Sequence, residues 1–250
     1  MDITLTGPKI LFEIPVLGGI PITETVVVGW LVLAVISALC VWLGRGLTLT
    51  NLSRKQVIAE WIVETVENFV RNNMGGPKFD GYIPLVFALF STSLISNLVS
   101  LTGLRSPTAD LSTEAAWAAV VFLLITRQKI KTNGFGGYLK GYTQPIALLT
   151  PFNVLSEIAT PISMACRHFG NILSGYVIGT LIYAALAVAS AALFGLLPGL
   201  LGDLLSQIPL LNFGIPAITS LYFDWFSGFM QAFIFCMLTV MYIANAAEEG

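Results

Sequence analysis

Long apolar runs without any charge limit the folds open to this chain more than any other feature of its sequence. The first run, residues 25–44, extends over about 20 residues with no acidic or basic side chain. A helix of that length crosses the ~30 Å hydrocarbon core of a bilayer. Charged residues make up only 10% of the chain, too few to give such runs the charged surface of a soluble protein, in which about 25% of residues are charged. The sequence therefore predicts an all-α integral membrane protein.

Four later segments are predicted to span the membrane as well: residues 82–104, 111–126, 162–197 and 217–247. In residues 52–72, apolar positions recur at helical spacing among Arg, Lys and Glu, which is typical of an amphipathic helix on the membrane surface. Asp110 and Glu114 suit the N-terminus of the third span, and the Gly- and Lys-rich stretch after it is interpreted as a flexible connector. Residues 1–250 are thus predicted to form one membrane domain of five spans and one surface helix.

The last two spans are longer than a bilayer requires. If fully helical, residues 162–197 would extend over about 54 Å and residues 217–247 over about 46 Å. Both lengths exceed the ~30 Å hydrocarbon core, so these helices are predicted to tilt steeply or to project beyond the membrane.

The basic residues indicate the orientation of the chain in the membrane. Nine of the 12 Lys and Arg residues lie in two segments, one between the first and second spans and one after the third: Arg45, Arg54, Lys55, Arg71, Lys78, Arg127, Lys129, Lys131 and Lys140. Cytoplasmic segments carry the excess of positive charge. The pattern therefore places the N-terminus outside and the C-terminus in the cytoplasm.

Arg167 is the strongest candidate for a functional residue. It lies in an apolar helix, where an arginine costs ~3 kcal/mol at the bilayer centre. The guanidinium of an arginine keeps its positive charge in proteins. It therefore requires an anionic or polar partner, unless it lies near enough to the helix end to reach the headgroups. Asn171 and Ser174, four and seven residues further on, share its helix face.

Other polar residues in apolar surroundings are weaker candidates. On the last helix, Asp224 and Gln231 are seven residues apart and share a face, and Gln231 could bond the guanidinium. Glu157 precedes the arginine helix and could line an aqueous path or lie at the interface. His168, the only histidine, could relay protons, although a packing role fits it better. Tyr176 suits either a polar channel or helix packing.

The sequence gives no sign of a metal site or cofactor. Its three cysteines lie in apolar stretches without CxxC or Cys/His pairing, as buried hydrophobic residues do. The Gly-rich stretch NGFGGYLKG lacks the GK[ST] ending and the preceding strand of a phosphate-binding loop. No cofactor, metal or nucleic-acid partner is therefore expected, and the lipid membrane is the chain's environment.

Several motifs, in order from about residue 82 to the C-terminus, resemble subunit a of the F-type ATP synthase. Arg167-His168-Phe169-Gly170-Asn171 resembles the family's arginine motif, usually written RLFGN. The segment that begins at Gln231, QAFIF, is similar to the motif of its last helix, and residues 107–110, PTAD, to the element after its second span. PFN at residues 151–153, followed by Glu157, resembles the entry to its long fifth helix.

The resemblance implies a non-catalytic subunit that translocates protons through a rotary motor. Its two long helices would lie steeply tilted along a ring of c subunits, with b subunits and the rest of the synthase as further partners. Arg167 would face the ring carboxylate and separate two offset half-channels. Asn171 and Gln231 would support it, while Glu157 and Asp224 would lie on the half-channels. The overall pattern suggests a bacterial plasma membrane.

Two positions depart from the family pattern, and two other functions are alternatives to it. His168 stands where leucine is usual, and Tyr176 stands where many members carry Glu or His, with Asp224 at the partner position. A secondary transporter would show two similar halves, and none is visible. A structural membrane scaffold would tolerate replacement of Arg167. The sequence leaves open whether the coupling ion is H⁺ or Na⁺.

Overall fold

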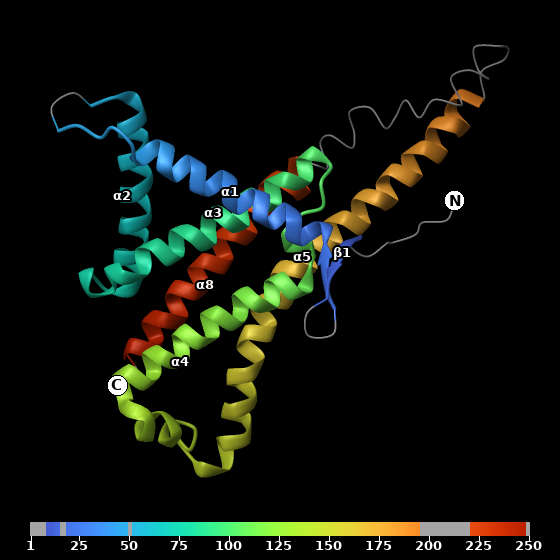
Figure 1. The fold of residues 1–250 in the computed structure, drawn as a ribbon. Coiled ribbons are helices and arrows are strands. Elements are labelled where there is room, and N and C mark those ends of the chain that lie inside the picture. The colour runs from blue at the N-terminus through green and yellow to red at the C-terminus, as the bar shows by residue number, and fades with distance from the viewer. Residues whose placement is uncertain (1–8, 16–18, 50–51, 196–220, 249–250) are drawn as a thin grey trace.

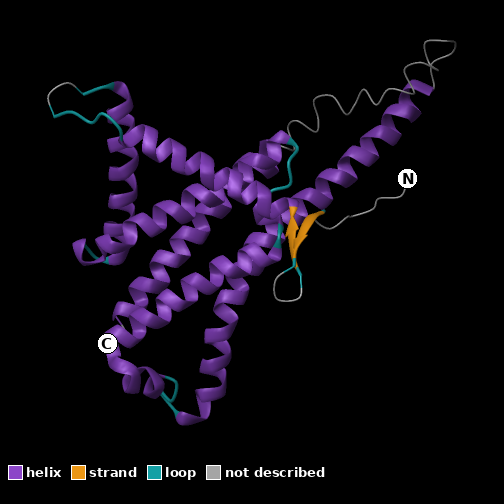
Figure 2. Ribbon diagram, viewed as in Figure 1, coloured by secondary structure: helices purple, strands orange, loops and turns teal. Residues whose placement is uncertain are grey.

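The N-terminal part of the chain forms a small hairpin that leads directly into the first long helix. The computed structural model describes residues 9–15, 19–49, 52–195 and 221–248. Strands β1 (Ile10–Ile14) and β2 (Ile20–Thr23) pair antiparallel, and α1 (Glu24–Gly44) follows without a break. Figure 2 shows that all other regular structure described is helical. The hairpin was not predicted from the sequence, whereas the first predicted span agrees with α1 to within one residue.

Helix α2 (Arg54–Met74) is amphipathic, as predicted, and has clear signals at both ends. The Ser53 hydroxyl accepts a hydrogen bond from the Gln56 amide at 3.2 Å, and Gly75 ends the helix in the left-handed conformation, with φ of 82°. Val70 and Met74 are buried against the other helices, whereas Val57 and Trp61 are exposed. Its position on the membrane surface remains a prediction.

Helix α3 (Ile83–Val99) is framed by short 3₁₀ turns: η1 (Pro77–Tyr82) before it, η2 (Ser100–Thr102) after it, then η3 (Pro107–Ala109). Arg71 of α2 donates two hydrogen bonds to the Asp80 carboxylate, at 2.8 and 2.6 Å, and thereby fixes η1 to α2. On α3, Ser93, Ser96 and Asn97 are buried. Polar residues on a membrane helix usually face neighbouring helices, and these three do.

Helix α4 (Leu111–Gly141) is twice as long as the predicted third span. The Asp110 side chain caps it by accepting from the Ser112 amide at 3.2 Å. The predicted flexible connector is wrong: the stretch stays helical to Gly141, interrupted at Gly134, where φ is 69°. Glycine adopts that angle without strain, so the chain bends there and continues as helix.

Helix α5 (Thr150–Gly195) follows the turn η4 (Ala147–Leu149) and extends over 46 residues. The prediction that this helix begins at residue 162 is wrong, because Pro161 lies inside it and Glu157 belongs to the same helix as Arg167. A proline inside a helix removes one backbone hydrogen bond and bends the helix without having to end it. Figure 1 shows that α5 changes direction along its length.

The last helix begins with a π-helical segment. Residues Leu221–Ser227 form this segment, η6, and α8 (Gly228–Glu248) continues from it. The predicted span covered residues 217–247 as one α-helix; residues 217–220 of it, like residues 196–197 of the span before, lie outside the described residues. Wider π turns inside helices occur frequently at functional sites.

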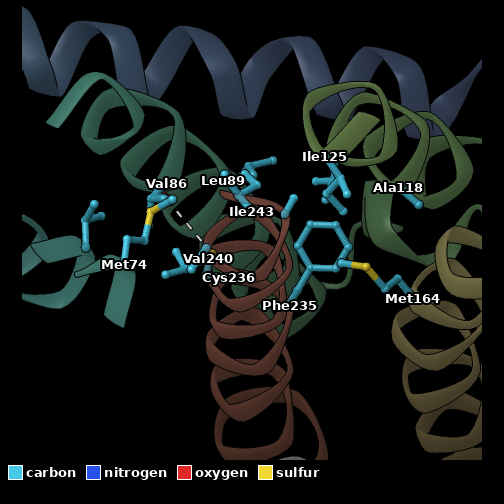
Figure 3. Packing of buried hydrophobic residues seen from close by; sticks show 14 of the residues in the cluster. Met74, Val86, Leu89, Ala118, Ile125, Met164, Phe235, Cys236, Val240 and Ile243 are labelled. Carbon is cyan, nitrogen blue, oxygen red and sulfur yellow. Dashed lines mark hydrogen bonds between the residues drawn. The ribbon is translucent and has the colours of Figure 1, made fainter. Parts of the chain in front are cut away.

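Helix α8 is at the centre of the hydrophobic core. Its residues Phe235, Cys236, Val240 and Ile243 are buried against α2, α3, α4 and α5 (Figure 3). In Figure 1, the C-terminal end of α8 lies near the bend of α4, and the hairpin lies at the other end of the bundle.

Four helical stretches of the described residues are long and apolar enough to cross a membrane: Glu24–Gly44, Pro77–Thr102, Ala147–Phe194 and Trp225–Glu248. Helix α4 is not among them, since Glu114 lies near its start and Arg127 follows its apolar turns. The chain is therefore a multi-pass helical membrane protein. The predicted span at residues 111–126, which lies in α4, and the steep tilts of the last two helices remain predictions.

Candidate ion-coupling site

Arg167 lies on a face of α5 that the rest of the described chain does not cover. Its neighbours Met164, Ala165 and His168 are buried against the core, whereas Arg167 itself is exposed. Three small residues on the same helix face are exposed as well: Ser163, Gly170 and Ser174. Together with Arg167 they follow one another at spacings of three or four residues. The exposed face thus combines one permanent cation with small residues, which allow another helix to approach closely.

Asn171 connects the arginine segment of α5 to the π segment η6. Its amide nitrogen donates to the Ser227 hydroxyl at 2.8 Å, and the same hydroxyl lies 3.1 Å from the Asn171 side-chain oxygen. The Ser174 hydroxyl, in contrast, donates to the Asn171 backbone carbonyl of its own helix at 2.9 Å. Among the residues predicted to support the arginine, Asn171 therefore connects α5 to η6 through its side chain.

We expect Asn171→Ala and Ser227→Ala to have effects that are not additive. Each substitution removes the same contact between α5 and η6, which contributes about 1 kcal/mol to stability. A double-mutant cycle on thermal unfolding in detergent should give a coupling energy of about 1 kcal/mol. Strictly additive effects would show that the pair does not hold the two elements together.

The remaining predicted residues on the last helix are only partly described. Gln231 lies in α8 and is buried, with 7% of its surface exposed. Asp224 lies in η6 and Tyr176 in α5, but their side chains lie outside the described part of the structure. Their roles remain predictions.

Glu157 lines a cavity between α4, α5 and α8. The cavity has a volume of about 810 Å³, and its other polar lining residues include Lys129, Asn133, Tyr138 and Asn245. The Tyr138 hydroxyl donates to Glu157 Oε1 at 3.2 Å, and Lys129 Nζ lies 3.8 Å from the same oxygen. Burial, together with the Glu157 carboxylate and Tyr138, raises the pKa of the neighbouring Tyr142 above its ordinary value. Tyr142 therefore stays a neutral hydroxyl in this cluster.

The distance between Glu157 and Arg167 follows from their positions on one helix. Ten residues separate them, or about 15 Å along the helix axis. The cavity is therefore separated from the arginine by about half the thickness of the hydrocarbon core. It lies at the end of α5 that is next to the basic residues of α4. Glu157 was identified as a candidate from the sequence, whereas its neighbours Lys129 and Tyr138 were not.

A buried polar network joins α3, η3 and the start of α8. The Asn97 amide donates to the Gly228 carbonyl at 2.9 Å, and the Thr108 hydroxyl donates to the Asn97 side-chain oxygen at 2.7 Å. Ser106 donates to the Ser96 carbonyl at 2.7 Å. Thr108 belongs to the PTAD element, so this motif fixes the contact between α3 and α8 in this chain.

Comparison with known proteins identifies the family. The family model described as "ATP synthase A chain" matches residues 26–244. The chain belongs to the ATP synthase subunit a family. It is 34% identical to "ATP synthase subunit a 1" of Crocosphaera subtropica, over 90% of this chain and 87% of that protein. It is 32% identical to "ATP synthase subunit a" of Moorella thermoacetica, over 93% of this chain and 94% of that protein. "ATP synthase subunit a, sodium ion specific" of Propionigenium modestum is 30% identical, over 98% and 86%.

The structure gives His168 a partner that was not predicted from the sequence. His168 Nδ1 lies 2.9 Å from Glu114 Oε2, and both side chains are fully buried. The imidazole also contacts the rings of Trp117 and Phe235. Glu114 was interpreted only as an acid suited to a helix N-terminus. Nothing in the local sequence connects it to a residue 54 positions later, because the contact depends on how α4 packs against α5.

Proposed function

We propose that this chain is the membrane stator of a rotary F-type ATP synthase and conducts protons through two offset half-channels. In this proposal, Arg167 faces the carboxylate of a passing c subunit. The chain itself catalyses no bond-making step. It couples proton movement through the membrane to rotation of the ring.

The exposed position of Arg167 on an apolar helix is the observation that carries the proposal. A guanidinium on a lipid-facing surface would be costly, so a polar partner must cover it. A ring carboxylate meets this requirement, because the cation favours the ionised form of an acid beside it. The small residues Ser163, Gly170 and Ser174 on the same face leave room for a ring helix. A secondary transporter or a scaffold gives no reason for this combination.

The cavity at Glu157 supports a half-channel that opens to the cytoplasm. It is polar along α4 and lies about 15 Å from Arg167, on the side where the excess of basic residues predicts the cytoplasm. The second half-channel would open outside and pass Asn171, Gln231 and Asp224. Tyr176, His168 and Ser174 complete the set of residues proposed near the path or in support of it.

The arrangement in the membrane forms part of the proposal. Helix α4 would be the third of five spans, in addition to the four long apolar stretches. Helix α2 would lie on the cytoplasmic surface, and the N-terminus would be outside. The long helices α5 and α8 would lie tilted along the c ring. The b subunits of the peripheral stalk would be further partners, and the membrane would be the bacterial plasma membrane.

We expect Glu157→Gln to slow proton pumping without abolishing it. The substitution removes a proton-exchanging carboxyl group but leaves the cavity, in which water can continue the path. The expected loss is about tenfold, less than a directly positioned acid–base group contributes. Pumping by inverted vesicles measures it, and Glu64→Gln on the exposed face of α2 is the matched control. An unchanged rate would remove Glu157 from the path.

The proposal as a whole is tested by ATP-driven ion uptake into inverted vesicles that contain the assembled complex. Acidification that depends on this chain and collapses with a protonophore is the expected result. Because one relative is named as sodium ion specific, ²²Na⁺ uptake is measured in parallel. Sodium uptake that persists with the protonophore would replace H⁺ by Na⁺ in the proposal, and the absence of any ion uptake would contradict the stator function.

A further inference from the structure

Glu114, His168 and Ser93 bring three helices together at one buried point. Glu114 lies on α4, His168 on α5 and Ser93 on α3, and each has no exposed surface. Glu114 Oε2 approaches His168 Nδ1 at 2.9 Å, and the Ser93 hydroxyl lies 3.3 Å from His168 Nε2. Both ring nitrogens of the histidine are therefore in contact with a polar side chain of another helix.

The cost of burying the Glu114 carboxyl group is offset by His168. The angle at the 2.9 Å contact is not that of an aligned hydrogen bond, and neither carboxylate oxygen has another hydrogen-bond partner among the described residues. The aromatic rings of Trp117 and Phe235 lie against the imidazole. A buried carboxyl group without a partner is strongly unfavourable. The imidazole of His168 is in contact with this carboxyl group and can offset the cost of its burial, either as an ion pair or by sharing a proton.

His168 and Arg167 are adjacent in sequence, so fixing one fixes the direction of the other. Successive helix residues are rotated by about 100°. With His168 held towards α4, Arg167 must point to the uncovered face of α5. A rotation of α5 by one residue position would expose His168, leave Glu114 alone in the core and turn the guanidinium away from that face.

We propose that Glu114 is a positioning residue: through its contact with His168 it sets the rotation of α5 and thereby directs Arg167 towards the c ring. The inference rests on the proposed function of Arg167. It assigns Glu114 and His168 a role as a mutually dependent pair, outside the proton path itself.

The pair can be tested because each partner is harmful without the other. His168→Leu leaves Glu114 buried and uncompensated, and Glu114→Leu leaves a buried imidazole with one polar contact. The double variant removes both groups together. Replacing a buried ion pair by apolar side chains is often neutral for stability, whereas removing one partner is strongly destabilising. We expect His168→Leu to lower ATP-driven pumping by about tenfold or more, and the double variant to restore it to within about twofold of wild type.

A second measurement reports the rotation of α5 independently of ion coupling. Asn171→Cys and Ser227→Cys are introduced into a chain whose Cys40, Cys166 and Cys236 are replaced by alanine, since Asn171 and Ser227 are in contact. Their cross-linking by a short thiol reagent is compared with and without the changes at Glu114 and His168. We expect the yield to fall in His168→Leu and to recover in the double variant.

The outcomes separate the possibilities. Recovery of pumping and cross-linking in the double variant supports positioning. A double variant that assembles and cross-links but stays inactive overturns it, and would place the pair on the proton path. Unchanged cross-linking in His168→Leu also overturns it. If His168→Leu fails to assemble, the amount of the double variant in membranes decides, and no recovery counts against the proposal. Cross-linking remains informative even if Arg167 proves not to couple ions.

Discussion

Arg167→Ala is expected to abolish ATP-driven pumping while the complex still assembles. The residue is exposed on α5 and is not part of the buried core, so its loss should cost little stability. In the proposed mechanism, a permanent cation at this point favours the ionised form of a ring carboxylate, and its positive charge would keep the two half-channels apart. Removing one preorganised charge partner typically costs a factor of about 100 to 1,000. Pumping should therefore fall by about a hundredfold or more.

Two accompanying measurements make this result decisive. Arg54→Ala removes the same charge from the exposed surface of α2 and should pump at the wild-type rate. Passive proton flow through vesicles that carry Arg167→Ala should rise, since the two proposed half-channels would no longer be separated by a cation. Normal pumping by Arg167→Ala would show that the arginine only anchors α5 at an interface, and the stator mechanism would be wrong.

Gly228→Val is expected to prevent stable insertion of the chain. Gly228 is buried at the junction of η6 and α8, where a Cβ atom would lie 3.0 Å from the Cβ of Asn97. The valine would push Asn97 away and break its 2.9 Å bond to the Gly228 carbonyl. Overpacking and the lost hydrogen bond together cost about 2–5 kcal/mol, a large part of the 5–15 kcal/mol that stabilises a typical protein.

The measurement is the amount of the chain in purified membranes, together with its unfolding temperature in detergent. Gly179→Val is the matched control, because a Cβ at Gly179 meets no atom of the described chain within 4 Å. Equal amounts of the two variants would show that the approach of α3 to α8 is not tight at this point.

The sequence predicted those features of the fold that depend on local pattern. The charge-free run before Arg45 and the amphipathic repeat before Gly75 identify α1 and α2, because length and periodicity are enough to define such helices. The elements after them are harder to predict at their ends. Pro161 indicates a boundary locally, yet α5 continues through it because helices bend at proline when packing holds both sides.

The candidate site could be predicted only as far as its residues lie close together in sequence. Arg167 and Asn171 were identified from one helix face and from family motifs. Glu114 was missed because its partner lies on another helix, and no periodicity reports contacts between helices. Ser227 and Lys129 were missed for the same reason: each takes its significance from a residue on another element.

The exposure of the long helix α5 also bears on the stability of the chain before it is assembled with its partners. Beyond His168, Ser190 is the only residue of α5 that is buried among the side chains described, while Leu173, Leu181, Val188 and Leu193 remain uncovered. Within the described part of the chain, about half of this long helix, with Arg167 near the start of that half, is therefore left uncovered. If a c ring covers this face, as proposed, an unassembled copy should be short-lived, and the subunit should join the complex late.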